Sequence, residues 1–372
     1  MRLLIAGGGT GGHLFPGLAL AEEVRDRDPS AAVLFVGTAQ GIEAEVVPRE
    51  GFTLETIEQR GIKNVGLLGA ARGAAQVPLA MLQAARILRR FRPDVVVGVG
   101  GYSSGPVVLA AALARYPTAI LEQNAVPGMT NRILSRFVRA VLVNFDDSSA
   151  WFPEEKVQVV GNPVRRAVAA GASPVVKVQT LGAKKKKGEG DFRVLVLGGS
   201  QGARALNEAV PPAVAALAEP LRARMRVRHQ AGKAHDESVR AAYDGLHLAT
   251  QVKVEAFIRE MATAYGTADL AVCRAGATTL AELTAAGVPS ILVPFPHAAD
   301  DHQTANAQSL ADAGAAVLLP QAELTPERLA RELAALADDP DRLAAMAAAA
   351  RAVARPDAAA RAADACWALT EG

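Results

Sequence analysis

The sequence predicts an α/β protein with two doubly wound, parallel-sheet domains. Short runs rich in valine, isoleucine and leucine alternate with amphipathic stretches, which is the pattern of strand–helix–strand units. The runs contain few polar residues, as expected of parallel strands that helices cover on both faces. The whole series occurs twice within 372 residues, a length that suits two domains.

Twelve apolar runs are expected to form the two sheets, six in each. The stretches between them include residues 76–92, whose apolar positions recur at helical spacing. The first six runs are 2–6, 32–36, 94–99, 118–121, 140–143 and 157–160, and the second six are 193–197, 225–229, 252–255, 269–272, 290–293 and 316–319.

The boundary between the domains is expected at residues 161–163, Gly-Asn-Pro, where the first series ends. Residues 171–191 then mix glycine and proline with a run of four lysines, Lys184 to Lys187, which is typical of a solvated loop. We therefore assign residues 1–163 to a first domain, 164–355 to a second domain and 356–372 to a terminal helix.

The composition excludes several classes of protein. A formal net charge of +2 gives no indication of a nucleic-acid partner. Two cysteines, Cys273 and Cys366, are too few for a disulfide framework and favour a reducing compartment. The first residues lack the regions of a secretory signal, and no uncharged apolar run of about 18 residues occurs. We therefore expect a cytoplasmic protein without a membrane-spanning helix.

Each series begins with a strand that runs into a glycine-rich turn, GGGTGG at 7–12 and GGSQGAR at 198–204. Glycines allow positive φ and close approach of a ligand, and the start of the next helix attracts phosphate. Gly7, Gly9 and Gly12 fit G-x-G-x-x-G, but Gly37-Thr38 supplies no acid for a ribose at the end of the next strand. His13 also stands where a Walker motif needs lysine. Neither NAD nor ATP is favoured, and a tight turn without a ligand remains the alternative.

Further polar clusters follow the predicted strands. They occupy residues 98–106, 122–132, 273–283 and 294–307. Ligands of doubly wound sheets bind at the carboxyl ends of the strands, so these clusters are expected to lie at the binding edge of each sheet. The pattern predicts two domains that face a cleft lined by polar loops.

His13 and Glu122 are the two candidates for a general base. His13 begins a predicted helix, whose positive end disfavours an imidazolium and leaves a neutral ring able to accept a proton. The alternative is a histidine that merely packs against the turn. Glu122 follows a predicted strand, and its alternative role is an ordinary salt bridge.

No metal site is predicted. His297 and His302 lie near Asp300 and Asp301, but their spacing does not fit a zinc site. The Asp-Arg-Asp triplet at 26–28 is similar to a metal-binding motif of sugar-nucleotide enzymes, yet it falls at the polar end of a helix. We interpret it as surface.

Eight motifs in sequence order resemble those of the MurG family, the N-acetylglucosaminyltransferases of peptidoglycan synthesis. Any one of them is weak, and the set in order is specific. They are GGTGGHLFPGLALA (8–21), GGYSSGP (100–106), EQNAVPGMTNR (122–132), GNPVR (161–165), GGSQGAR (198–204), HQAGK (229–233), CRAGATTLAE (273–282) and DHQTANA (301–307). Leu121 departs from the histidine that some members carry before the glutamate.

The resemblance implies a GT-B fold, two Rossmann-like domains with a terminal helix that packs back on the first. It implies UDP-N-acetylglucosamine as donor, bound mainly by residues 164–355, and lipid I as acceptor, bound mainly by residues 1–163. Lipid II would form with inversion at the anomeric carbon. No cofactor and no metal are implied. Further implied partners are an anionic membrane surface, at the cytoplasmic face, and other proteins of cell-wall synthesis and division.

The resemblance also implies roles for individual residues. Ile258 would face the uracil through its backbone, Glu282 would take the ribose hydroxyls, and Gln303 would touch the sugar. His13 or Glu122 would be the base. The donor contacts would be Thr10, Gly11, Gly12, Asn124, Arg165, Ser200, Ile258, Ala277, Thr278, Thr279, Leu280, Ala281, Glu282 and Gln303, and the acceptor contacts Gly100, Gly101, Tyr102 and Ser103.

Residues 62–92 are the candidate membrane contact. They are apolar with scattered cations, as in segments that attach to anionic lipid. The alternative is an ordinary amphipathic helix packed on the sheet. The cations are Lys63, Arg72, Arg86, Arg89, Arg90 and Arg92.

Three other functions stay open. Another GT-B glycosyltransferase would share the fold and should lack EQNAVPGMTNR. A UDP-N-acetylglucosamine epimerase would act without an acceptor. A non-catalytic nucleotide-sugar binding protein would bind the donor without turnover.

Overall fold

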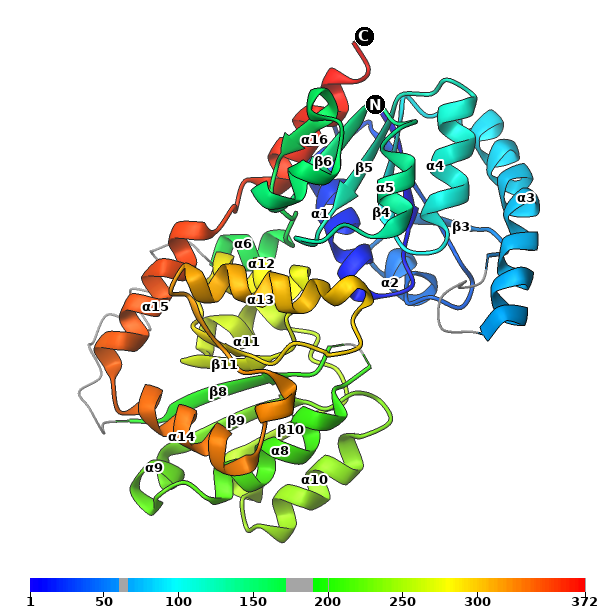
Figure 1. The fold of residues 1–372 in the computed structure, drawn as a ribbon. Coiled ribbons are helices and arrows are strands. Elements are labelled where there is room, and N and C mark those ends of the chain that lie inside the picture. Colours follow the sequence, from blue (N-terminus) through cyan, green and yellow to red (C-terminus); the bar gives the residue numbers. More distant parts are fainter. Residues whose placement is uncertain (60–65, 172–189, 200, 372) are drawn as a thin grey trace. The chain divides into compact units, whose positions relative to one another are not determined.

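The computed structural model describes residues 1–59, 66–171, 190–199 and 201–371 (Figure 1). The chain divides into two compact units. Unit 1 contains Met1–Arg165 and Arg355–Gly372, and unit 2 contains Arg166–Ala354. The predicted lysine loop at Lys184–Lys187, the predicted donor contact Ser200, and Lys63 with the first residues (62–65) of the candidate membrane contact lie outside the described residues.

Unit 1 is built on a seven-stranded sheet in the order β3-β2-β1-β4-β5-β6-β7, with parallel pairing throughout. All six runs predicted for this sheet form strands. The seventh, β3, was not predicted because its sequence, TLET, is no apolar run and the strand is only partly buried. The strands are β1 (Arg2–Gly7), β2 (Ala32–Gly37), β3 (Thr53–Thr56), β4 (Val95–Gly100), β5 (Thr118–Glu122), β6 (Ala140–Val143) and β7 (Val157–Val159).

Helices flank this sheet, and its two faces carry separate apolar clusters. The last helix of the chain packs against α1 within this unit (Figure 1). An ion pair between Arg27 and Asp364, 2.5 Å long, and the fully buried Cys366 belong to that contact. The helices are α1 (Gly11–Arg27), α2 (Glu43–Arg49), α3 (Gly66–Phe91), α4 (Ser104–Leu113), α5 (Met129–Leu134) and α16 (Ala358–Ala368), with 3-10 turns η1 (Asp146–Trp151) and η2 (Glu154–Lys156).

Unit 2 is built on a six-stranded sheet in the order β10-β9-β8-β11-β12-β13, again with parallel pairing. Each of the six runs predicted for the second sheet forms a strand. Continuous apolar sequence suits the strands covered on both faces, whereas β9 (MRVRHQ) and β10 (VKVE) alternate apolar and charged residues and are partly buried. The strands are β8 (Phe192–Leu197), β9 (Met225–Gln230), β10 (Val252–Glu255), β11 (Leu270–Cys273), β12 (Ser290–Leu292) and β13 (Ala316–Leu318).

Local sequence explains where several helices of unit 2 begin. The Thr325 side chain accepts a hydrogen bond from the N–H of Arg328 at 3.1 Å and caps α14, and Asp339 caps α15 in the same way; each cap is followed by proline. The helices are α6 (Arg166–Gly171), α8 (Arg204–Ala215), α9 (Glu219–Arg224), α10 (Asp236–Gly245), α11 (Met261–Thr267), α12 (Ala277–Ala286), α13 (His302–Asp312), α14 (Pro326–Ala337) and α15 (Pro340–Val353), with 3-10 turns η3 (Ala249–Gln251), η4 (Ala299–Asp301) and η5 (Gln321–Glu323).

In each sheet, the direction in which successive strands are added reverses next to the first strand of that unit. In unit 1 the reversal lies between β1 and β4, and in unit 2 between β8 and β11. In doubly wound folds, ligands bind at the carboxyl ends of the strands beside such a reversal. The polar clusters singled out from the sequence follow these strands and their neighbours.

Candidate active site

The glycine loops after β1 and β4 touch each other through their backbones. The N–H of Gly8 donates to the carbonyl of Gly100 at 3.2 Å. A Cβ at Gly7 would lie 2.3 Å from that same carbonyl oxygen, and a Cβ at Gly101 would lie 2.3 Å from the carbonyl oxygen of Gly8. Some of the glycines predicted to admit a ligand therefore serve to bring two loops of the protein together.

His13 lies in the first turn of α1, directly against the second of these loops. A Cβ at Gly100 would be 2.5 Å from His13 Nδ1, so the glycine makes room for the imidazole ring. The N-cap residue Thr10 is exposed, makes no side-chain capping bond, and no acidic residue lies in the first turn of the helix. The positive end of α1 and a half-buried imidazole thus lie together at the edge of the sheet.

Glu122, the second candidate base, is held by four donors. One of its oxygens accepts from the backbone N–H of Asn124 at 2.9 Å and from its side-chain amide at 3.2 Å. The other accepts from the N–H of Gly128 at 3.1 Å and from the side chain of Asn131 at 2.9 Å. The residue is only 1% exposed. Both oxygens of this carboxylate are therefore occupied, and the side chain anchors the turn after β5.

The predicted acceptor loop, Gly100–Ser103, leads from β4 into α4. Gly100 and Gly101 adopt φ values of +94° and +86°, conformations that glycine favours. Tyr102 is 51% exposed, whereas Ser103 is buried at the N-cap position of α4. The tyrosine ring is therefore the side chain of this loop that is available to a ligand.

Arg165 ends the first stretch of unit 1 and stacks on a residue of α1. Its guanidinium carbon lies 4.5 Å from the centre of the Phe15 ring. Phe15 is two residues beyond His13 in the first part of α1. The stacking places a permanent cation near the start of that helix.

In unit 2, the loop after β8 contacts the loop after β9 in the same close manner. A Cβ at Gly202 would lie 2.0 Å from the carbonyl oxygen of Ala231. Gln230, at the end of β9, donates its amide to the carbonyl of Gly199 at 2.9 Å and accepts the N–H of Ile258 at 2.9 Å. Because that N–H is engaged, only the carbonyl of Ile258 is left for a ligand.

The predicted diphosphate and ribose residues, 277–282, form the first turns of α12. Gly276 is the N-cap, without a side-chain capping bond and without an acidic residue in the first turn. Leu280 is 1% exposed and belongs to the core, so it can meet a ligand only through its backbone. The hydroxyl of Tyr265 donates to Glu282 Oε2 at 3.0 Å and orients that carboxylate. The remaining members are Ala277, Thr278, Thr279 and Ala281.

Gln303 lies in the first turn of α13 and is tied to the loop after β12. Its side-chain oxygen accepts the N–H of Phe295 at 3.0 Å, which directs its amide hydrogens elsewhere. The preceding residues Asp300 and Asp301 both have positive φ, 53° and 51°. Within the described part of the chain, no group of three or more histidine, cysteine or carboxylate side chains is arranged to hold a metal ion.

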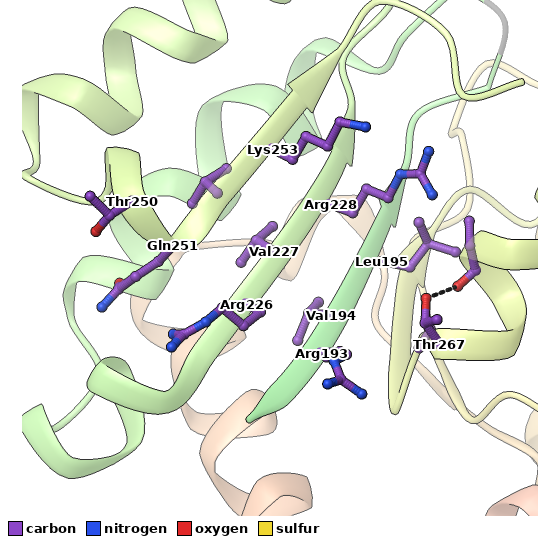
Figure 2. A pocket seen from close by; sticks show the side chains of 13 residues that line it. Arg193, Val194, Leu195, Arg226, Val227, Arg228, Thr250, Gln251, Lys253 and Thr267 are labelled. Atoms are coloured by element: carbon purple, nitrogen blue, oxygen red, sulfur yellow. Dashed lines mark hydrogen bonds between the residues drawn. The ribbon is translucent and has the colours of Figure 1, made fainter. Parts of the chain in front are cut away.

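A cavity of about 320 Å³ in unit 2 lies away from these loops (Figure 2). It is lined by residues within β8, β9 and β10 and contains none of the predicted site residues. Figure 2 shows Arg228 and Lys253 on neighbouring strands, and both pair with Glu255, at 2.7 and 3.4 Å. Burial raises the pKa of Glu255, but the hydrogen bond and charge of Arg228 lower it more, so the pKa lies below its usual value. We interpret this cavity as a positively charged sheet surface: four cations line it, Arg193, Arg226, Arg228 and Lys253, and two carboxylates, Glu255 and Asp191, form ion pairs with three of them.

Two residues with several contacts to these loops were missed at the sequence level. Gln230 stood inside a quoted motif without a role, and Glu43 was not considered because it is six residues beyond the end of β2. Glu43 Oε2 accepts the N–H of Gly9 at 2.7 Å. The cluster of glycines around Glu43, at 8, 37 and 41, was the available signal.

Comparison with known proteins decides the family. Residues 3–143 match the glycosyltransferase family 28 N-terminal domain, and residues 193–362 match its C-terminal domain. The UDP-N-acetylglucosamine--N-acetylmuramyl-(pentapeptide) pyrophosphoryl-undecaprenol N-acetylglucosamine transferase of Myxococcus xanthus is 50% identical over 366 residues, 98% of this chain and 92% of that protein. A crystal structure of MurG from Acinetobacter baumannii matches with a TM-score of 0.76 and 34% identity over 99% of both chains.

The chain belongs to the MurG family of glycosyltransferases. The predicted resemblance, the two-domain GT-B fold and the enzyme class are thereby confirmed. A UDP-GlcNAc 2-epimerase from Neisseria meningitidis, solved bound to UDP-GlcNAc, also matches, with a TM-score of 0.67 but 13% identity over 99% of this chain and 100% of that chain. That likeness shows the shared fold alone. Among the described helices, none is both long and apolar enough to cross a bilayer.

Proposed function

We propose that this chain transfers N-acetylglucosamine from UDP-N-acetylglucosamine to the C4 hydroxyl of the N-acetylmuramyl unit of undecaprenyl-linked lipid I, which gives lipid II for peptidoglycan synthesis. The observation that carries the proposal is 50% identity, over 98% of the chain, to an enzyme named for this transfer. The charges and hydrogen-bonding groups at the strand ends suit the same reaction.

His13 is the proposed general base. It takes the proton of the acceptor hydroxyl while that oxygen attacks the anomeric carbon from the side opposite the diphosphate. The bond from the anomeric carbon to the diphosphate breaks, UDP leaves with the electron pair, and the configuration inverts to a β-1,4 link. The half-buried ring at the start of α1 supports this role.

The departing diphosphate is proposed to meet fixed positive charge. The start of α12 carries no acidic residue and no side-chain cap, so its N–H groups suit phosphate oxygens. Arg165, stacked on Phe15, supplies a cation that cannot be neutralised. Groups that are already oriented before the charge develops stabilise the transition state most effectively.

The hydrogen bonds of unit 2 support the proposed contacts to the nucleoside and the sugar. The carbonyl of Ile258 would accept the N3–H of uracil, since its own N–H donates to Gln230. Glu282 would accept from the ribose hydroxyls while Tyr265 holds one of its oxygens. The amide hydrogens of Gln303 would face the sugar, because its oxygen accepts from Phe295.

Peripheral attachment to the cytoplasmic face of the membrane is also proposed. Leu79 and Leu82 of α3 are 45% and 61% exposed, and α3 packs on α4, whose last residue Leu113 is 63% exposed (Figure 1). On η1, Trp151 is exposed beneath the guanidinium of Arg132, 3.9 Å away. Exposed apolar side chains beside arginines suit the surface of an anionic bilayer.

Vesicle binding tests this attachment. Removing a buried leucine contact is worth about 1.5–3 kcal/mol, so Leu82→Glu should weaken binding to phosphatidylcholine/phosphatidylglycerol vesicles by about tenfold or more. Leu246→Glu, at a leucine of unit 2 that is 38% exposed, is the matched control and should bind as the parent does. Equal binding of the two variants would contradict the assignment of this surface.

The transfer itself is tested by UDP release from UDP-N-acetylglucosamine, with and without a lipid I analogue, in EDTA. Release that requires the acceptor and yields a lipid II analogue by mass spectrometry supports the proposal. Release without acceptor would indicate an epimerase or hydrolase instead. Donor binding without any release would indicate a non-catalytic role.

A further inference from the structure

Glu43 is a buried carboxylate that the proposed mechanism does not use. It is the first residue of α2 and is 1% exposed. Its Oε2 accepts the N–H of Gly9 at 2.7 Å, and its Oε1 accepts both the N–H and the hydroxyl of Thr38 at 2.9 Å. A single side chain therefore joins the glycine loop after β1 to the turn after β2. The bond from Gly9 is the shortest of the three.

Three glycines make room for this carboxylate. A Cβ at Gly8 would lie 2.4 Å from Glu43 Cδ, one at Gly37 would lie 2.6 Å from its Cγ, and one at Gly41 would lie 2.0 Å from its Oε2. Contacts under 3 Å are not tolerated without a shift of the neighbour. The backbone on three sides thus leaves the Glu43 side chain little freedom.

Two backbone hydrogen bonds tie this loop to its neighbours: the N–H of Gly8 donates to the carbonyl of Gly100 at 3.2 Å, and the N–H of Gly9 donates to Glu43. Gly7, Gly8 and Gly9 all have positive φ, and glycine is the residue with the greatest freedom to leave such a conformation. A Cβ at Gly9 would find no atom within 4 Å, so packing does not restrain this residue. The bond to Glu43 holds Gly9 four residues before His13.

A carboxylate after the second strand has a different role in dinucleotide-binding folds, where it takes the ribose hydroxyls. Here the carboxylate faces N–H groups of the protein itself. Gly9 and Thr38 supply three hydrogen bonds to its two oxygens. This side chain is accordingly suited to hold a loop and not a nucleotide.

We propose that Glu43 is a positioning residue for the transfer: by holding Gly9 it fixes the start of α1 and, with it, the imidazole of His13. The inference rests on the proposed function of His13 as the base. A displacement of about 1 Å in a reacting group can lower a rate by about 10²-fold, so a looser loop should reduce kcat. The implied donor contacts Thr10, Gly11 and Gly12 follow Gly9 and shift with it, whereas those of unit 2 are not affected, so kcat should fall by a larger factor than the KM for UDP-N-acetylglucosamine rises.

The first variant is Glu43→Gln, which keeps the shape and replaces one acceptor oxygen by an NH₂ donor. The amide cannot accept from both Gly9 and Thr38 in either orientation, so one backbone N–H loses its partner. We expect kcat to fall by about 10- to 100-fold, with a smaller rise in the donor KM. Thr38→Val is the matched control. It removes one bond to the same carboxylate, leaves the Gly9 bond in place and should keep the parental kcat.

A second variant tests the same role in case Glu43→Gln does not fold. Gly41→Ala keeps the acid but places a Cβ where Glu43 Oε2 now lies, and Gly41 has no positive φ to make alanine strained. It should lower kcat in the same way by moving the carboxylate from Gly9. All variants are assayed as full chains for acceptor-dependent UDP release, at a temperature where circular dichroism shows them folded.

The outcomes separate this inference from the proposed function. Parental kcat in either folded variant, or an equal loss in Thr38→Val, would overturn the positioning role. A raised donor KM with unchanged kcat would overturn it too. If the unmodified chain released no UDP in response to the acceptor, the proposed function would fail instead.

Discussion

Lowering the pH from 6.5 to 4 should destabilise unit 2 through one buried histidine. His229 in β9 is fully buried, with Nδ1 3.0 Å from the Tyr243 hydroxyl and Nε2 3.1 Å from Asn207 Oδ1. Asn207 donates its own amide to the carbonyl of Ala231, so its oxygen faces the ring. These bonds assign the proton to Nε2 and make Nδ1 the acceptor of the Tyr243 hydroxyl. A neutral imidazole ring therefore donates to Asn207 and accepts from Tyr243, so both groups have a hydrogen-bond partner.

The size of the effect follows from the pKa. Burial lowers the pKa of His229 from 6.5 to about 4. Between those values the unfolded chain binds a proton that the native protein does not, so stability falls as the pH falls through this window. At 1.36 kcal/mol for each unit of difference, the loss is about 3 kcal/mol.

The perturbation that isolates this contribution is His229→Gln, which cannot titrate. The variant is less stable than the parent at pH 7, because a buried ring and its hydrogen bonds are altered. The difference in free energy of unfolding between the parent and the variant should shrink by about 3 kcal/mol as the pH is lowered to 4, since only the parent loses stability through this group.

Urea unfolding at a series of pH values measures this difference in free energy of unfolding. Both tryptophans of the chain, Trp151 and Trp367, belong to unit 1, so their fluorescence reports that unit while far-UV circular dichroism reports both. The acid-sensitive transition should appear in the dichroism without a matching change in fluorescence. A gap that stays constant from pH 7 to 4, or a shift confined to the fluorescence, would refute the reasoning.

Three further predictions concern the loops and a helix cap. His13→Ala should lower kcat by about 10²–10⁴-fold without a change in the unfolding midpoint, and a parental kcat would show that His13 is not the base. Glu122→Gln places an amide NH₂ against hydrogen-bond donors and should lower the free energy of unfolding in urea by about 1–3 kcal/mol. Gly100→Ala should reduce kcat by at least about tenfold because its Cβ meets the His13 ring, while Gly51→Ala, also at positive φ but without a close contact, should affect only stability. Thr325→Ala should cost about 1 kcal/mol by loss of its cap, and an unchanged midpoint would contradict the capping role.

Much of the architecture was predictable because the determining pattern is local. Twelve strands follow from apolar runs, since a strand covered on both faces needs no polar residue on either. The exception, β3, has the sequence TLET and is partly exposed. The starts of α1 and α8 were placed because a glycine turn that follows a strand begins a helix.

The sequence by itself therefore determined the two sheets, the glycine loops and the family, each of which depends on neighbouring residues or on motif order. Only the tertiary structure decided which groups those loops contact. Glu43 reaches Gly9 across 34 positions, and Gly8 bonds to Gly100 across 92. It also showed that Glu122 is occupied by four donors and that Gln230 engages the N–H of Ile258. Partners in a hydrogen bond are chosen by distance and direction after folding, and neither quantity is written in the order of residues along the chain.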